Sequence, residues 1–126
     1  MQKALDAVNA CAGLFGACGI AAAAAAAHMA GAERLNSVAL ILLVHAAALP
    51  GLTTKAQDGA AGARLWLTAA MALCLGATLF SADVALLILR GAQLFPAAAP
   101  AGGTIMILGW LIAFCAGLAG LLRGYR

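Results

Sequence analysis

Few polar side chains in this sequence lie where they could do chemistry. Asp83 and His45 each stand inside a long apolar run, and His28 stands near the end of another. Ionisable groups inside a lipid-spanning helix are costly, so they normally face protein, water or a partner rather than lipid. A carboxylate that accepts a hydrogen bond from an imidazole is also the kind of group that proton relays use.

Asp83 and His45 are expected at similar depth. Each lies about eight residues from the same end of its apolar run, which at about 1.5 Å per residue is roughly 12 Å. Consecutive helices joined by a short connection are usually neighbours, so the two side chains are expected to meet. The pair would then be a polar clasp that fixes helix register, or a proton-handling or ligand-binding site. In the remaining alternative, a protonated Asp83 bonds to backbone, Ser81 or Thr104, and His45 lies elsewhere.

A metal site has no local motif behind it. The four cysteines show no CxxC or CxxH spacing, and His28 is expected to lie about 9 Å shallower than His45. We therefore predict no metal, no cofactor and no catalytic residue. The candidate polar site within the apolar runs comprises His45, Asp83, Ser81 and His28, and the two histidines with Asp83 are the ligands to test first if a metal is present.

The composition is that of a membrane protein. Of the 126 residues, 66% are hydrophobic and 9% are charged, against about 25% charged in soluble domains. The net charge of +3 comes from bases at the ends of apolar segments, where membrane orientation explains them and nucleic-acid binding is not indicated. One domain over residues 1–126 is expected.

The apolar runs predict an all-α fold of four transmembrane helices in an antiparallel, up-down bundle. A crossing needs about 20 apolar residues, and four runs approach or exceed that length. The first is too long for the h-region of a signal peptide. The expected spans are residues 5–30, 37–52, 65–90 and 104–122.

Proline and glycine set the expected boundaries. Pro50 and Gly51 are expected to end the second span, which leaves a short helix and a polar loop over residues 53–63. Pro96 and Pro100, with two following glycines, are expected to keep residues 92–103 irregular.

Small residues suggest close helix packing. In lipid, glycine and alanine let helix backbones approach one another. Three glycines precede an alanine run in the first span, and small residues recur every four positions in the last. The expected packing positions are Gly13, Gly16, Gly19, Gly109, Ala113 and Gly117.

Basic and aromatic residues predict the orientation. With four spans, five bases fall on the side of the termini and two on the other, which places both termini in the cytoplasm, or in the matrix of an organelle. The expected interface anchors are Arg64, Trp66, Arg90 and Arg123.

All four cysteines lie in apolar segments, where a secreted type of disulfide framework is not expected. We interpret Cys11, Cys18, Cys74 and Cys115 as small hydrophobic residues.

Several short motifs resemble a known family. Residues 100–103 (Pro-Ala-Gly-Gly), followed by Gly109-Trp110, resemble the Pro-x-Gly-Gly and Gly-Trp pattern of the YgdD/YwdK-like small inner-membrane proteins. Phe80-Ser81, His45-Ala46 and Ala27-His28 are similar to further elements of that family. The resemblance implies four transmembrane helices in a bacterial inner membrane, and it assigns no reaction because the family's domain has no known function.

The leading functional hypothesis is a non-enzymatic membrane protein, an accessory or structural subunit that packs against a larger membrane complex or lipid. Its expected partners are membrane lipid and a membrane protein or a second copy of itself. The alternative is a small proton-coupled carrier that uses His45 and Asp83. A metal- or redox-linked membrane protein is the third possibility.

Overall fold

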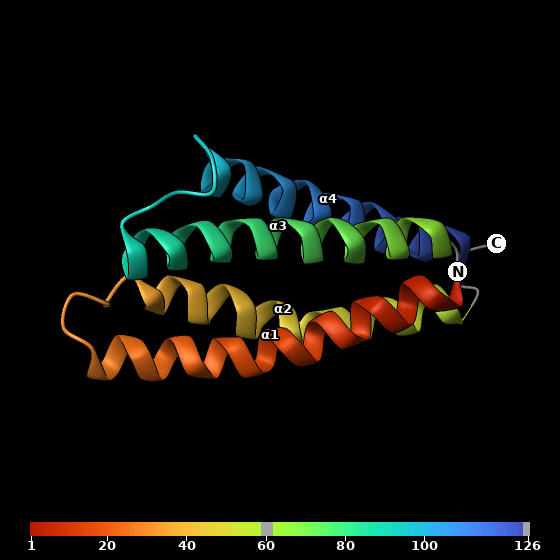
Figure 1. Cartoon of the computed structure of the whole chain (residues 1–126). Helices are drawn as coiled ribbons and strands as arrows, with labels where there is room; N and C mark the ends of the chain where they lie inside the picture. Colours follow the sequence, from red (N-terminus) through yellow and green to blue (C-terminus); the bar gives the residue numbers. More distant parts are fainter. Residues whose placement is uncertain (59–61, 125–126) are drawn as a thin grey trace.

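The computed structural model describes residues 1–58 and 62–124, with side chains up to Leu122. These residues form four α-helices and no strand, which confirms the all-α, four-helix prediction (Figure 1). The helices are α1 (Gln2–His28), α2 (Leu35–Gln57), α3 (Ala63–Arg90) and α4 (Ala98–Gly124).

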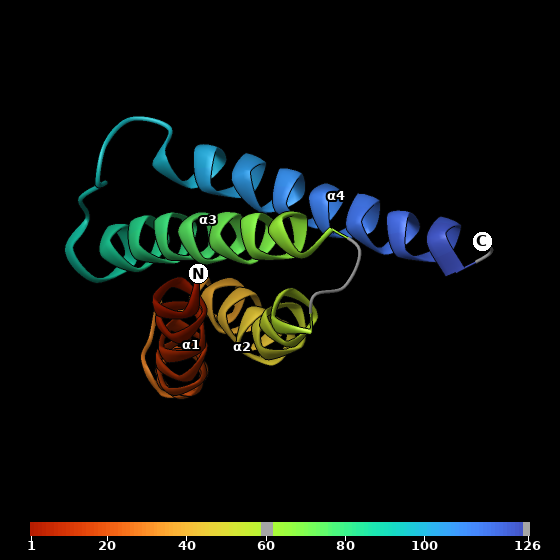
Figure 2. The ribbon, with the colours of Figure 1, turned by 90° about the vertical axis from the view of Figure 1, so that its right-hand side faces the viewer.

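The helices pack as two pairs in two layers. The closest packing joins α1 to α2 and α3 to α4, while α2 also packs on α3, and α1 touches α3 only sparsely. Figure 2 views α1 nearly along its axis but shows α3 and α4 lengthwise, so the two layers cross obliquely. The α2–α3 contact is therefore the main seam between them.

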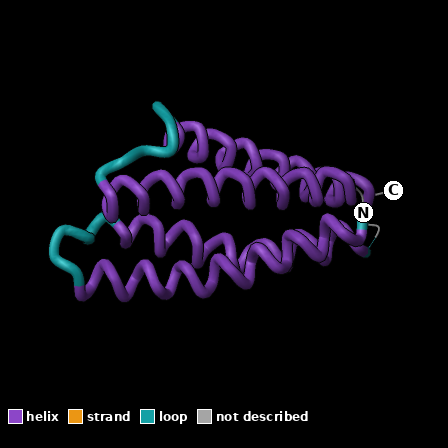
Figure 3. Tube along the Cα trace, in the orientation of Figure 1, coloured by secondary structure: helices purple, strands orange, loops and turns teal. Residues whose placement is uncertain are grey.

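The two fully described connections lie at the same end of the molecule. The loops over residues 29–34 and 91–97 lie at one end of the helices, and the N-terminus lies at the other (Figure 3). Each of these loops contains a glycine in the left-handed conformation, Gly31 (φ 80°) and Gly91 (φ 66°), which a glycine adopts without the strain that a Cβ would add. Gly91 caps the C-terminus of α3. Its N–H bonds to the carbonyl of Leu87 at 2.9 Å, and its left-handed conformation turns the chain out of the helix.

The core is built mainly from leucine and small residues. Leu5, Leu49 and Leu73 are almost fully buried, and they are accompanied by alanines with no exposed surface such as Ala69 and Ala77. Small side chains at the seams bring the helices close together, so dispersion contacts accumulate over short interhelical distances.

The expected end of the second helix at Leu52 is wrong. α2 continues through Pro50 to Gln57, so most of the expected polar loop is helical, and residues 59–61 of that loop lie outside the described residues. A proline inside a helix costs about 3 kcal/mol because it removes a backbone donor. Burial of Leu52, Thr53 and Ala56 against neighbouring elements opposes that cost. With 23 residues, α2 is roughly 34 Å long at 1.5 Å per residue, long enough to cross a bilayer.

The expected irregular stretch before the fourth helix is also partly wrong. α4 begins at Ala98, so Pro100 and the paired glycines are helical. Pro100 is the third residue of the helix, within the first turn, where backbone N–H groups have no partner inside the helix and a missing donor costs little. The first and third helices differ from the expected spans by only a few residues at their ends.

All four helices are long and apolar enough to cross a membrane. Their outward surfaces carry large apolar side chains: Phe114 is 67% exposed, Ile20 66%, Leu40 64% and Leu75 60%. A soluble protein of this size rarely exposes so many large apolar side chains.

Thr53 links the end of α2 to α1. Its hydroxyl oxygen lies 2.9 Å from both Asn9 Oδ1 and the carbonyl oxygen of Pro50, and the residue is 2% exposed. Thr53→Val is expected to lower the free energy of unfolding by about 1 kcal/mol, since the hydroxyl contacts are lost at nearly constant volume. Denaturation in detergent micelles measures the change.

Thr54→Val is the matched control. Thr54 also donates to the Pro50 carbonyl, at 2.9 Å, but it is exposed and bonds to no other helix. A change within about 0.5 kcal/mol is expected there. Equal losses in the two variants would contradict a specific role for the contact with Asn9.

Candidate functional site

Asp83 lies on α3 and is 4% exposed. Its carboxylate accepts two backbone hydrogen bonds from the segment that follows the helix. The N–H of Leu94 donates to Oδ1 at 2.8 Å, and the N–H of Ala99 donates to Oδ2 at 3.2 Å. Both oxygens are thus engaged by the α3–α4 connection and the start of α4.

These bonds make Asp83 a cap for a different helix. Ala99 is the second residue of α4, so its N–H is one of the donors that lack a partner inside the helix. The partial positive charge of a helix N-terminus favours a nearby carboxylate. Asp83 therefore has a structural role, because its two hydrogen bonds hold the α3–α4 loop and the first turn of α4 against α3.

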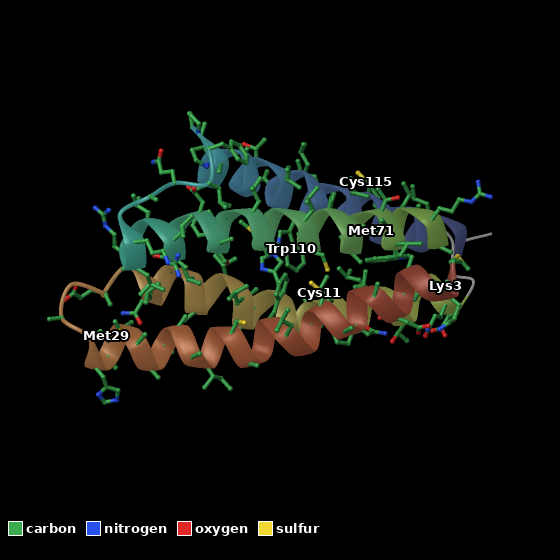
Figure 4. All side chains as sticks on the ribbon, in the orientation of Figure 1. Lys3, Cys11, Met29, Met71, Trp110 and Cys115 are labelled. Atoms are coloured by element: carbon green, nitrogen blue, oxygen red, sulfur yellow. The ribbon has the colours of Figure 1, made fainter. Side chains whose placement is uncertain are left out.

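His45 occupies a different environment. It is 3% exposed, and its Nδ1 lies 2.7 Å from the carbonyl oxygen of Ile41 on its own helix. The imidazole packs against Trp110 of α4 with ring centroids 5.9 Å apart and planes inclined by 52°, and Figure 4 labels Trp110 midway along the helices. Among the described residues, Nε2 has no hydrogen-bond partner.

The expected hydrogen bond between His45 and Asp83 is not formed. Equal depth along two helices does not make two side chains meet, because each must also point toward the other around its helix axis. Here the Asp83 oxygens bond to the following segment, whereas His45 packs on Trp110. The alternative in which Asp83 bonds to backbone matches the partners found here, although both Asp83 oxygens accept these bonds and neither donates one. The carrier hypothesis loses the residue pair on which it was based.

The other candidate polar residues do not join a common site. Ser81 is 5% exposed, and its Oγ has no hydrogen-bond partner in the described part of the chain. His28 is exposed at the last residue of α1, and the Thr104 hydroxyl donates to the Pro100 carbonyl at 3.0 Å. Across residues 1–58 and 62–124, no group of three His, Cys, Asp or Glu side chains is arranged to hold a metal ion.

The expected interface anchors lie near helix ends. Arg64 is exposed in the first turn of α3, and Arg90 is exposed at the last residue of that helix. Trp66 is half-buried and lies near Gly117, where an added Cβ would come within 3.7 Å of the indole. Arg123 belongs to α4, but its side chain lies outside the described residues.

The expected packing positions differ in how closely they pack. A Cβ added at Gly19 would lie 2.8 Å from the Leu43 side chain, and one at Gly109 would lie 2.9 Å from the Leu73 side chain. Ala113 is buried. The other two positions pack loosely. A Cβ added at Gly16 would lie 3.9 Å from the Ala46 side chain, and one added at Gly13 would meet no atom within 4 Å.

The tightest approach involves two glycines that sequence reasoning did not single out for packing. A Cβ on Gly102 would lie 2.6 Å from the Phe80 nitrogen and 2.8 Å from the Gly76 carbonyl oxygen. A Cβ on Gly76 would lie 2.7 Å from the Gly102 carbonyl oxygen. The backbones of α3 and α4 thus touch at Gly76 and Gly102. Gly102 was missed because the stretch was expected to be irregular.

Two of the four cysteines lie together. The Cys11 and Cys74 side chains, on α1 and α3, line the same shallow pocket, and both are half-buried. Cys18 and Cys115 are exposed on apolar helices. All four thiols are free.

The comparisons with known proteins give no match to a family model, a curated protein or a solved structure. The class of the protein therefore rests on its own structure. Its four helices are each long enough to cross a bilayer and carry large apolar side chains on their outward surfaces, which is compatible with a membrane protein.

Proposed function

We propose that the chain is a non-enzymatic integral membrane protein that packs against lipid and a larger membrane assembly, as an accessory or structural subunit. The single observation that supports this most strongly is the pair of hydrogen bonds that Asp83 accepts. The one deeply buried acid among the described residues is engaged by two backbone N–H groups, so it holds the fold together rather than facing a substrate.

The outer surface of α4 favours a protein partner. α4 packs mainly on α3, and its outward positions carry large apolar groups that include Ile107, Leu111 and Phe114. Van der Waals packing between such surfaces is a main source of helix association in lipid. A partner helix could therefore lie along α4 without any change in the four-helix fold.

We further propose an up-down arrangement in a bacterial inner membrane, with both termini in the cytoplasm. The excess of bases on the side of the termini supports this orientation. Membership of the YgdD/YwdK-like family is also a proposal, supported by the Pro-Ala-Gly-Gly stretch at residues 100–103 and by Gly109-Trp110.

Purification in mild detergent followed by native mass spectrometry tests the proposed role. We expect a second protein or a second copy of this chain, together with bound lipid, to remain with the protein. A bare monomer without protein or lipid would count against it. Extraction of membranes with alkaline carbonate tests the location separately, because an integral protein stays in the pellet.

A further inference from the structure

An apolar groove runs between α1 and α3, with α2 as its floor. Its volume is about 540 Å³, and it is lined at one end by Met29, Leu35 and Leu89 and at the other by Cys11 and Thr78. The groove exists because α1 and α3 touch only sparsely where the two layers cross. Alanines of α1 on its wall add little bulk to fill it.

We propose that this groove binds one acyl chain of a membrane phospholipid, whose phosphate lies at the end of the groove near Met29. The inference rests on the proposed location of the protein in a membrane. It goes further by assigning a site and a ligand class to part of the surface.

The groove is long enough for an acyl chain of one leaflet. Its α3 wall extends from Thr78 to Leu89, where eleven steps of about 1.5 Å give roughly 16 Å. Its α1 wall is longer, from Cys11 to Met29, where eighteen such steps give roughly 27 Å. Half of a hydrocarbon core of about 30 Å is roughly 15 Å. A chain that enters at the Leu89 end would therefore reach the middle of the bilayer at Thr78.

The charges near that end suit a phosphate. Arg34 directly precedes Leu35, Arg90 directly follows Leu89, and both arginines are exposed. Guanidinium groups bind phosphate oxygens through paired hydrogen bonds. Glu33 is the acid nearest to Arg34 in sequence, and its Oε1 accepts a hydrogen bond from the Gly31 N–H at 3.3 Å. Asp83 is the acid nearest to Arg90, and it is buried and already bonded to the N–H groups of Leu94 and Ala99.

The wall favours a hydrocarbon chain over a polar ligand. Thr78 is one of two residues with hydroxyl groups on it, and its hydroxyl already donates to the Cys74 carbonyl at 2.8 Å. The other is Ser81, whose Oγ is buried with less than 1 Å² of its surface exposed. A ligand held by polar recognition would have to use Ser81, whereas an acyl chain would not.

The experiment uses the full chain in liposomes of phosphatidylethanolamine and phosphatidylglycerol that contain a phospholipid with a diazirine near the end of one acyl chain. After illumination, mass spectrometry identifies the labelled peptides. We expect labelling to concentrate near Cys11 and Thr78, at the inner end of the groove. Labelling spread evenly over the exposed apolar residues, Phe114 among them, would overturn the proposal.

Ala21→Phe and Ala24→Phe form a matched pair. Both alanines are exposed on α1, but only Ala21 lines the groove. Ala21→Phe is expected to reduce labelling at the inner end by about tenfold, since its ring occupies the space of the chain, and Ala24→Phe is expected to leave it unchanged. Equal labelling in the two variants would overturn the proposal.

Ser81→Ala separates the two kinds of ligand. Unchanged labelling in the Ser81→Ala variant supports an acyl chain in the groove. Loss of labelling would overturn the acyl-chain proposal and would indicate a ligand bound through the Ser81 hydroxyl. Carbonate extraction of the same samples shows which idea has failed. A protein that stays in the membrane without groove labelling contradicts only the acyl-chain site, whereas a protein that is extracted contradicts the membrane location as well.

Discussion

Asp83→Ala is expected to lower the free energy of unfolding by about 2–4 kcal/mol, because two backbone donors lose a charged acceptor at once. The N–H of Leu94 would be left without its partner in the loop, and the N–H of Ala99 would be left without a cap at the start of α4. Denaturation in detergent micelles measures the loss. Amide hydrogen exchange should locate the loss. Relative to the unsubstituted protein, exchange in the variant should become faster over residues 91–99 and stay unchanged at the middle of α1.

Two further variants test whether the effect comes from capping. Asp83→Asn keeps one acceptor oxygen but places an amide donor beside a backbone donor, so an intermediate loss is expected. Asp6→Ala removes an exposed acid that bonds only to the Gln2 side chain, at 2.8 Å, and a change within about 0.5 kcal/mol is expected. Normal stability in Asp83→Ala would contradict the cap.

Gly102→Ala is expected to cost about 1–3 kcal/mol, the usual range for overpacking a tight interface. The added Cβ would lie 2.6 Å from the Phe80 nitrogen and 2.8 Å from the Gly76 carbonyl oxygen. Both are backbone atoms, which cannot rotate away as a side chain can, so α4 must move off α3. That movement would also pull the Ala99 N–H away from Asp83. Thermal unfolding in detergent, followed by circular dichroism, measures the effect.

Gly103→Ala is the matched control for this prediction. It is the next residue of the same helix, and a Cβ there would meet no atom within 4 Å. Alanine is the better helix former, so Gly103→Ala is expected to be neutral or to stabilise by up to about 1 kcal/mol. Similar losses in the two variants would show that helix flexibility matters here, and that close approach of the backbones does not.

Local errors in the expected boundaries have a common cause. Pro50 and Pro100 were both interpreted as helix breakers, yet both lie in helices. For Pro100 the reason is local, since a first-turn donor is dispensable. For Pro50 the reason is tertiary, because Leu52, Thr53 and Ala56 are buried beyond it. Burial of that kind cannot be deduced from the proline alone.

The sequence by itself determined the class of fold. The chain has four apolar runs of about the length that a bilayer requires, separated by turn-forming residues. Backbone groups in lipid must form their hydrogen bonds within their own segment, so each run is expected to be a helix. The sequence also singled out Asp83 as the acid that needs a partner, since an ionised group in an apolar run must be compensated.

Only the tertiary structure decided what compensates Asp83. Depth along a helix follows from counting residues, but direction around the axis follows from how helices cross and rotate. The oblique crossing of the two layers opens the groove between α1 and α3, and the glycine contact at Gly76 and Gly102 brings α4 against α3. That contact holds the N-terminus of α4 beside the Asp83 carboxylate, and His45 is left to pack against Trp110.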